Sequence, residues 1–150
     1  MNLTSSITWM FAGSVFIGIF LNAMNFLADD YQHIYFSSTT LVYSALLMAS
    51  LMSILEVLMH YSHSGVLNKT ALIAFLGFAS LCVYLLIEQI GVDDENWLKR
   101  MISHHSTALT TSKKIVSKTK NQEVKELATT IIAAQQNEIK IMKRILNNIK

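Results

Sequence analysis

Three long apolar segments constrain the fold of this chain more than any other feature of its sequence. They cover residues 7–28, 39–59 and 71–90, and each is close to the ~20 residues that a helix needs to cross a bilayer. The first and third contain no charged residue before Glu88, and the second contains only Glu56. The sequence therefore predicts three transmembrane helices.

The absence of proline indicates that the rest of the chain is helical as well. The 150 residues contain no proline and only five glycines, so the residues that usually mark turns and the ends of strands are scarce. The start, MNLTSSITW, lacks the basic region and short apolar core of a cleaved signal peptide, so we expect the first span to be retained. The predicted fold class is all-α, with three transmembrane helices followed by a soluble antiparallel helical hairpin.

The distribution of charge divides the chain at residues 91–94. Residues 1–92 carry one lysine, no arginine and four acids, whereas residues 93–150 carry eleven basic and six acidic residues. We therefore expect a membrane domain over 1–92 and a soluble hairpin over 93–150. Lys69 is the one basic residue in the loops between the spans, which places the N-terminus in the cytoplasm and residues 93–150 outside. The net charge of +2, with basic residues interleaved with Glu, argues against nucleic-acid binding.

The second part of the chain has the periodicity of two helices. Asp93 or Asp94 is a suitable N-cap for the first, and Asn121 for the second, with residues 117–121 as the turn. Long helices joined by a short turn run antiparallel. The apolar stripe of the second helix is wider than one partner would cover, so we expect a homodimer or packing on the membrane part.

One methionine and two histidines lie within little more than one turn of the first soluble helix. Met101, His104 and His105 stand at positions i, i+3 and i+4 and can share a face. The antiparallel geometry adds Met142 from across the interface. Thioethers and imidazoles are soft donors that suit Cu(I) better than Mg²⁺ or Ca²⁺, and Glu138 could orient an imidazole. The alternative is that the histidines are simply packed, since adjacent side chains point ~100° apart.

A second stripe of candidate ligands lies in the second span. Met52, Glu56, Met59 and His63 follow one helical face. They could form a second soft-metal site or a transfer path within the membrane. The simpler interpretation is that the methionines fill gaps between spans and that Glu56 bonds a neighbouring Ser, Tyr or Asn, because a carboxylate in a span needs a partner.

Both soluble helices resemble the family called domain of unknown function 305. The resemblance rests on the segments DDENWLKRMISHHSTALTTSKKI and NQEVKELATTIIAAQQNEIKIMKRIL. The matching positions are Met101, His104, His105, Leu127, Ala128, Ile132, Gln135, Glu138, Ile139 and Met142. The first part of the chain is similar to a membrane-anchored branch of the family, through Met59-His60-Tyr61.

The resemblance implies a ferritin-like helical bundle, and it implies copper binding through Met101, His104, His105 and Met142. We expect the protein in the bacterial inner membrane, with the hairpin on the periplasmic or extracellular side. The chain departs from the family pattern at three positions: Ser103 replaces a proline, Thr110 an aspartate and Thr111 a methionine. Many members contain two such motifs, and the single hairpin here again favours a homodimer.

The leading hypothesis is therefore a membrane-anchored protein that binds copper, as Cu(I), for sequestration or tolerance, without catalysis. The main alternative is a structural or interaction module that self-assembles through its hairpin and binds no metal. A small copper enzyme is less well supported, since the sequence shows no HExxH motif, no Ser-His-Asp order and no cysteine nucleophile.

Overall fold

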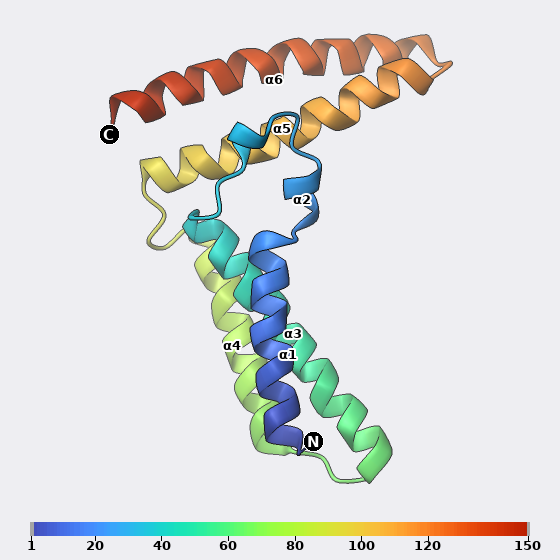
Figure 1. Cartoon of the computed structure of the whole chain (residues 1–150), viewed down its shortest axis with the longest axis vertical. Helices are drawn as coiled ribbons and strands as arrows, with labels where there is room; N and C mark the ends of the chain where they lie inside the picture. The colour runs from blue at the N-terminus through green and yellow to red at the C-terminus, as the bar shows by residue number, and fades with distance from the viewer. Residues whose placement is uncertain (1, 150) are drawn as a thin grey trace. The chain divides into compact units, whose positions relative to one another are not determined.

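The structure is a computed structural model that describes residues 2–149, and all of the regular structure in that range is helical (Figure 1). The chain divides into two compact units. One comprises the residues up to Leu21 together with Thr39–Gly91, and the other comprises Asn22–Ser38 together with the residues from Val92 onward. The elements in order are α1 (Leu3–Phe20), α2 (Ala23–Phe26), the 3₁₀ turn η1 (Tyr31–His33), α3 (Thr39–Ser64), α4 (Lys69–Ile87), α5 (Asp94–Lys118) and α6 (Gln122–Asn148).

Three helical segments are long and apolar enough to span a membrane, as predicted. They are Leu3–Phe26, Thr39–Ser64 and Lys69–Ile87. The first predicted span, 7–28, overlaps the segment Leu3–Phe26, but its helix begins earlier, at Leu3, and the segment is interrupted after Phe20. Asn22 causes this break, because its extended backbone ends α1 and its side chain accepts a hydrogen bond from Met24 N at 2.8 Å. The helix α3 ends at Ser64, and the next residue, Gly65, has φ +69°, the left-handed conformation that commonly follows a helix.

Small residues let α1 and α3 pack closely within the first unit. Gly18 is buried on α1, and a Cβ at this position would lie 2.8 Å from Cβ and 2.9 Å from Cα of Ala45. Ala45 and Ala49, one turn apart on α3, are both fully buried. Because lipid tails give apolar helices little reason to associate, such close backbone contact is a main source of attraction between spans.

The second unit contains the two long helices α5 and α6, which run side by side in opposite directions (Figure 1). Asp93 caps α5 by accepting from Asn96 N at 2.8 Å, and Asn121 caps α6 by accepting from Val124 N at 3.2 Å. The helix α5 continues to Lys118 and so includes the first two residues of the predicted turn, 117–121. Both predicted caps are confirmed, because a side-chain oxygen satisfies a free N–H at each helix start.

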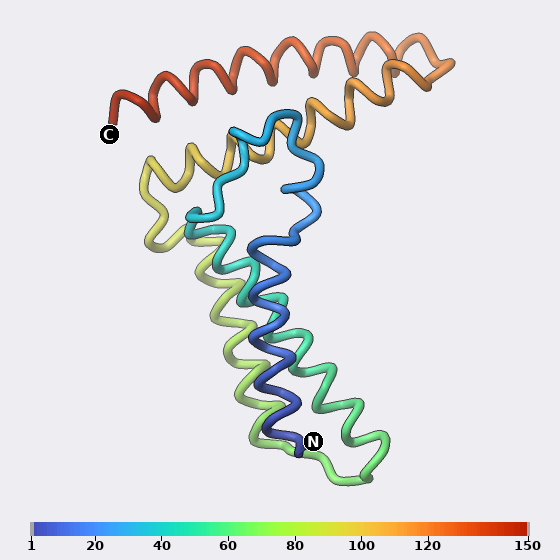
Figure 2. Tube along the Cα trace, viewed as in Figure 1, coloured from blue at the N-terminus to red at the C-terminus, as the bar shows by residue number. Residues whose placement is uncertain are grey.

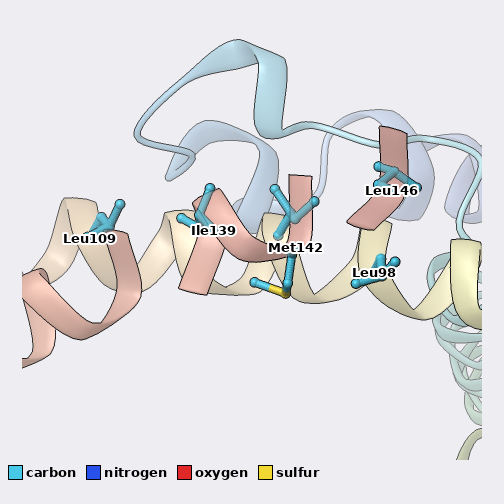
Figure 3. Packing of buried hydrophobic residues seen from close by; sticks show 6 residues of the cluster. Leu98, Leu109, Ile139, Met142 and Leu146 are labelled. Carbon is cyan, nitrogen blue, oxygen red and sulfur yellow. The ribbon is translucent and has the colours of Figure 1, made fainter. Parts of the chain in front are cut away.

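The core of the hairpin is a cluster of aliphatic side chains and one methionine. Figure 3 shows Leu98 of α5 beside Leu146 of α6, and Met142 between Ile139 and Leu146. Met101, Tyr35 and Ile132 are half-buried against this cluster. The register confirms that the start of α5 meets the end of α6, which brings Met101 and Met142 to the same region. The cluster consists of Leu98, Ile102, Leu109, Ile139, Met142 and Leu146.

The segment 22–38 belongs to the hairpin unit, although it connects the first two spans in the sequence. It lies along α5, as Figure 2 shows in blue to cyan. Ser103 Oγ donates to His33 O at 2.6 Å, and Ser106 Oγ accepts from Asp29 N at 2.7 Å. The predicted division at residues 91–94 is where the hairpin unit resumes, but it missed this segment. Hydrogen bonds and buried surface, rather than sequence continuity, join segment 22–38 to α5.

Candidate metal centre

A hollow at the α5–α6 interface brings together most of the predicted ligands. Its volume is about 260 Å³, and two methionines, a histidine and a carboxylate contribute to its wall. The side chains come from the first half of α5 and the second half of α6, which lie beside each other because the helices run antiparallel. The lining residues are Trp97, Met101, His105, Glu138, Ile141 and Met142.

The two methionines approach the hollow from opposite helices. Met142 is only 7% exposed and belongs to the hydrophobic core, and Met101 is half-buried against that core. Both thioethers are therefore held by packing rather than exposed on flexible surface side chains. A thioether fixed in this way can act as a soft, uncharged donor with little loss of rotamer freedom.

His105 points into the same interface and meets a carboxylate there. Its Nδ1 lies 3.0 Å from Oε2 of Glu138, although the two groups are not aligned as in a regular hydrogen bond. Burial lowers the pKa of His105, against the carboxylate of Glu138, which raises it; His104 lowers it further. The imidazole is consequently neutral at pH 7. With the proton on Nδ1, beside the carboxylate, the lone pair of Nε2 is available to a metal.

His104 does not share this environment. Its ring is exposed and does not line the hollow, and its centroid lies 5.9 Å from that of His105. This is the geometry expected of adjacent helical residues, whose side chains point ~100° apart. Of the four predicted ligands, the structure gathers Met101, His105 and Met142 in one place and leaves His104 outside.

Two of the positions at which the sequence departs from the expected pattern are clearly placed in the structure. Thr111 is exposed, and its hydroxyl donates to Thr107 O at 3.1 Å. It lies six residues beyond His105, about 9 Å along the helix, and it does not line the hollow. Ser103, where the resemblance implies a proline, is buried and holds segment 22–38 through the carbonyl of His33.

The candidate stripe in α3 has a structural explanation for its charged member. Ser6 of α1 donates a hydrogen bond to Oε1 of Glu56, which is the kind of partner that the packing interpretation predicts. His63 Nδ1 lies 2.8 Å from Met59 O within the same helix. Met52 is half-buried, and Met59 and His63 are exposed. These contacts pair Glu56 with a serine and His63 with a backbone carbonyl, and they do not bring the candidate ligands of the stripe together.

The candidate centre differs from a site for a harder metal ion. Across residues 2–149, no three side chains from His, Cys, Asp and Glu are grouped so that they could hold a metal. The hollow in the hairpin instead combines two sulfur donors with one imidazole.

Sequence reasoning missed two features around the hairpin. Trp97 lines the hollow, and its position one turn before Met101 could have indicated this. The second feature is His33, which is buried against Ser106 with Nδ1 2.9 Å from Oγ. The sequence did offer a signal for the contact between His33 and α5. Asp29, Asp30 and His33 are polar residues between two apolar spans, and the hairpin is basic.

Comparisons with known proteins place the hairpin in a family. Residues 89–150 match the family described as Domain of unknown function (DUF305). Over 135 residues the chain is 38% identical to "Uncharacterized protein L153" of Acanthamoeba polyphaga mimivirus, an alignment that covers 90% of this chain and 88% of that protein. No match was found among solved structures. The similarity to the viral protein extends over both the spans and the hairpin.

Proposed function

We propose that this chain, which belongs to the DUF305 family, is a membrane-anchored protein that binds copper as Cu(I), for sequestration or tolerance and without catalytic turnover. The observation that carries the proposal is the hollow where Met101, His105 and Met142 meet beside Glu138. Its composition, rather than its size, favours this metal, because thioether ligands select Cu(I) over harder cations.

The residues of the hollow fit such an ion in three respects. The two thioethers and the neutral imidazole give an uncharged donor set. The carboxylate of Glu138, 3.0 Å from His105 Nδ1, would fix the ring so that Nε2 faces the metal. The apolar neighbours Trp97 and Ile141 would limit the access of water. A bound Cu(I) would supply redox-active copper in a soft environment, while the chain's own residues hold and shield it.

The adjacent histidines provide a matched test. Competition of the full chain with a chromophoric Cu(I) chelator, in detergent, should show at least about tenfold weaker binding for His105→Ala and little change for His104→Ala, since each lost ligand is worth more than ~1.4 kcal/mol. Met101→Leu and Met142→Leu should also weaken binding, because they conserve volume and remove only sulfur. Equal Cu(I) affinity in the wild type, His105→Ala and Met142→Leu would refute the site, as would a preference for Zn²⁺.

A second property supports the interaction module, alone or together with copper binding. An apolar stripe of α6 lies beside the hollow and is not covered within the described chain. The stripe consists of Leu127, Ile141 and Ile145, which are 62%, 39% and 40% exposed. Burying such side chains would contribute about 25 cal/mol per Å². We propose that a second copy covers this stripe, which would complete a ferritin-like four-helix arrangement.

The mass of the detergent-solubilised protein, measured by light scattering, tests the dimer. Leu127→Glu should convert it to monomer, because a charge would be buried in the interface. Thr129→Glu, on another face of α6, should not. A wild-type monomer would refute the dimer. A dimer that binds no Cu(I) would instead support the interaction module. The bacterial inner-membrane location and the periplasmic placement of the hairpin stay predictions.

A further inference from the structure

A second hollow lies on the other side of the hairpin, between segment 22–38 and α6. It has a volume of about 310 Å³ and a mixed wall of charged, amide and aliphatic groups. All of its lining residues belong to the hairpin unit. It shares no lining residue with the candidate metal centre. The lining residues are Asp29, His33, Leu109, Gln136, Ile139, Lys140 and Lys143.

Two lysines of this hollow carry charges without a counterion. Among residues 2–149, no carboxylate lies within 4.0 Å of Nζ of Lys140 or Lys143. The carboxylate of Asp29 is already engaged, since both of its oxygens accept from Lys113 Nζ, at 2.6 and 2.7 Å. Asp30 is the other acid near His33. Lys113, Lys140 and Lys143 outnumber Asp29 and Asp30, so the surroundings of the hollow carry a net positive charge.

The hydrogen bonds of His33 direct an N–H toward the same place. Ser106 Oγ accepts from Asp29 N, an obligatory donor, and lies 2.9 Å from His33 Nδ1. His33 Nδ1 is the only acceptor that the described residues offer to the hydroxyl proton of Ser106. We therefore assign the proton of the neutral ring to Nε2.

The assigned tautomer creates an unsatisfied pair of donors. His33 is 7% exposed, and its Nε2 lies 3.5 Å from Lys143 Nζ. With this tautomer both His33 Nε2 and Lys143 Nζ are donors, so neither can accept a hydrogen bond from the other. A buried donor that lacks an acceptor costs about 1–3 kcal/mol. An oxyanion placed in the hollow would accept from both atoms at once.

We infer that this hollow binds a phosphate group, held by His33, Lys140, Lys143 and Gln136. Phosphate fits better than a single carboxylate because its oxygens can accept from several converging donors. The hollow also has an aliphatic wall, made by Leu109 and Ile139, so the phosphate can carry an organic substituent. The same chemistry is offered by a free phosphate compound and by a phospholipid headgroup.

Equilibrium dialysis of labelled inorganic phosphate against the full chain, in a phosphate-free maltoside detergent, tests the inference directly. We expect one site per chain in delipidated wild type, and about tenfold or greater loss of affinity in Lys140→Gln/Lys143→Gln, since charge-assisted hydrogen bonds are lost. Lys120→Gln/Lys125→Gln, which changes two exposed lysines outside the hollow, should bind like the wild type. Circular dichroism establishes that each variant is folded, and Gln136→Leu provides a further variant that keeps both charges and should bind more weakly.

Phosphorus analysis of the purified protein identifies the source of the phosphate. Lipid phosphorus that is retained by the wild type, lost from the Lys140→Gln/Lys143→Gln variant and competed by added phosphate would identify a phospholipid headgroup. Uptake of free phosphate by protein that shows no preference for anionic over neutral phospholipid nanodiscs would identify a soluble compound. The inference is overturned if the wild type holds phosphate in neither experiment, or if the Lys140→Gln/Lys143→Gln variant binds it equally well.

Discussion

His105 of α5 and Glu138 of α6 meet across the hairpin, with Nδ1 3.0 Å from Oε2. The two residues are 33 positions apart in the sequence, and the antiparallel register of the helices brings them together. The contact has two consequences for the imidazole. It places Nδ1 of the ring beside a carboxylate, and it opposes the effect of burial on the pKa of His105. Glu138 is therefore a positioning residue for the proposed centre.

Glu138→Gln should weaken Cu(I) binding by about 10- to 100-fold, the usual effect of removing a carboxylate behind a histidine ligand. The thioethers and the imidazole would still be present, so binding should be weakened rather than abolished. Competition with a Cu(I) chelator measures the change. Glu123→Gln, in the first turn of α6 and far from the hollow in sequence, is the control. An unchanged affinity in Glu138→Gln would show that the carboxylate does not position His105.

Ser106→Ala should loosen segment 22–38 from α5. Ser106 is fully buried, and it bonds both Asp29 N and His33 Nδ1. Its removal leaves the half-buried N–H of Asp29 without this acceptor, and an unsatisfied donor of this kind costs up to about 1–3 kcal/mol. Amide hydrogen exchange of residues 22–38 should accelerate by about tenfold or more, while exchange in α3 and α4 stays unchanged. Thr129→Ala, at an exposed position of α6, is the control. Unchanged exchange in segment 22–38 would contradict the anchoring role.

Acid should also weaken the attachment of segment 22–38. Burial lowers the pKa of His33 below its ordinary value of about 6.5, Lys143 lowers it further, and Asp30 and Asp29 oppose the shift. In the unfolded chain the ring therefore binds a proton at higher pH than in the fold. The stability that the fold gains from a neutral His33 is fully present above pH ~6.5. It is lost as the pH falls below this value, by at most about 1.4 kcal/mol per pH unit. Below the folded pKa the loss is complete.

The pH effect can be measured as hydrogen exchange of segment 22–38 between pH 7.5 and 5, after correction for the intrinsic rate. The lowered pKa of His105 acts in the same direction, so the two histidines must be separated. His105→Asn should retain the acid sensitivity of segment 22–38, and His33→Asn should remove most of it. The reverse pattern would show that the sensitivity comes from the α5–α6 interface instead.

Gly18→Ala should destabilise the pairing of α1 and α3. The added Cβ would lie 2.8 Å from Ala45 Cβ and 2.9 Å from Ala45 Cα, and backbone cannot move away as a flexible side chain can. Overpacking of this kind costs about 1–3 kcal/mol. Gly13→Ala is the matched control, because a Cβ at Gly13 meets nothing within 4 Å. Unfolding of the detergent-solubilised protein by added SDS measures both variants, and equal midpoints would argue against the α1–α3 contact.

The hairpin was predictable in detail because its determinants are local. The cap residues Asp93 and Asn121, the spacing of apolar residues and the short turn all lie within the segment they control. The antiparallel register then followed, since two long helices joined by a short turn have little alternative. The same reasoning placed Met101 near Met142, and the structure confirms that both line one hollow.

The spans were recognised by length and hydropathy, but their ends were less predictable. Apolar composition continues through residues 21–28, so the sequence alone suggested a helix to residue 28. Asn22 ends α1 because its side chain caps α2. An asparagine within an apolar run gives only a weak signal of such a break.

Local sequence thus determined the helices, their caps and the soft donors at the start of α5. The tertiary structure alone decided which of the adjacent histidines faces the interface, because that choice depends on the rotation of α5 against α6. It also decided that residues 22–38 join the hairpin. Their partners, Ser103 and Ser106, lie about 70 residues away. Such long-range hydrogen bonds leave no periodicity in the sequence, since they depend on which surfaces meet after the helices have formed.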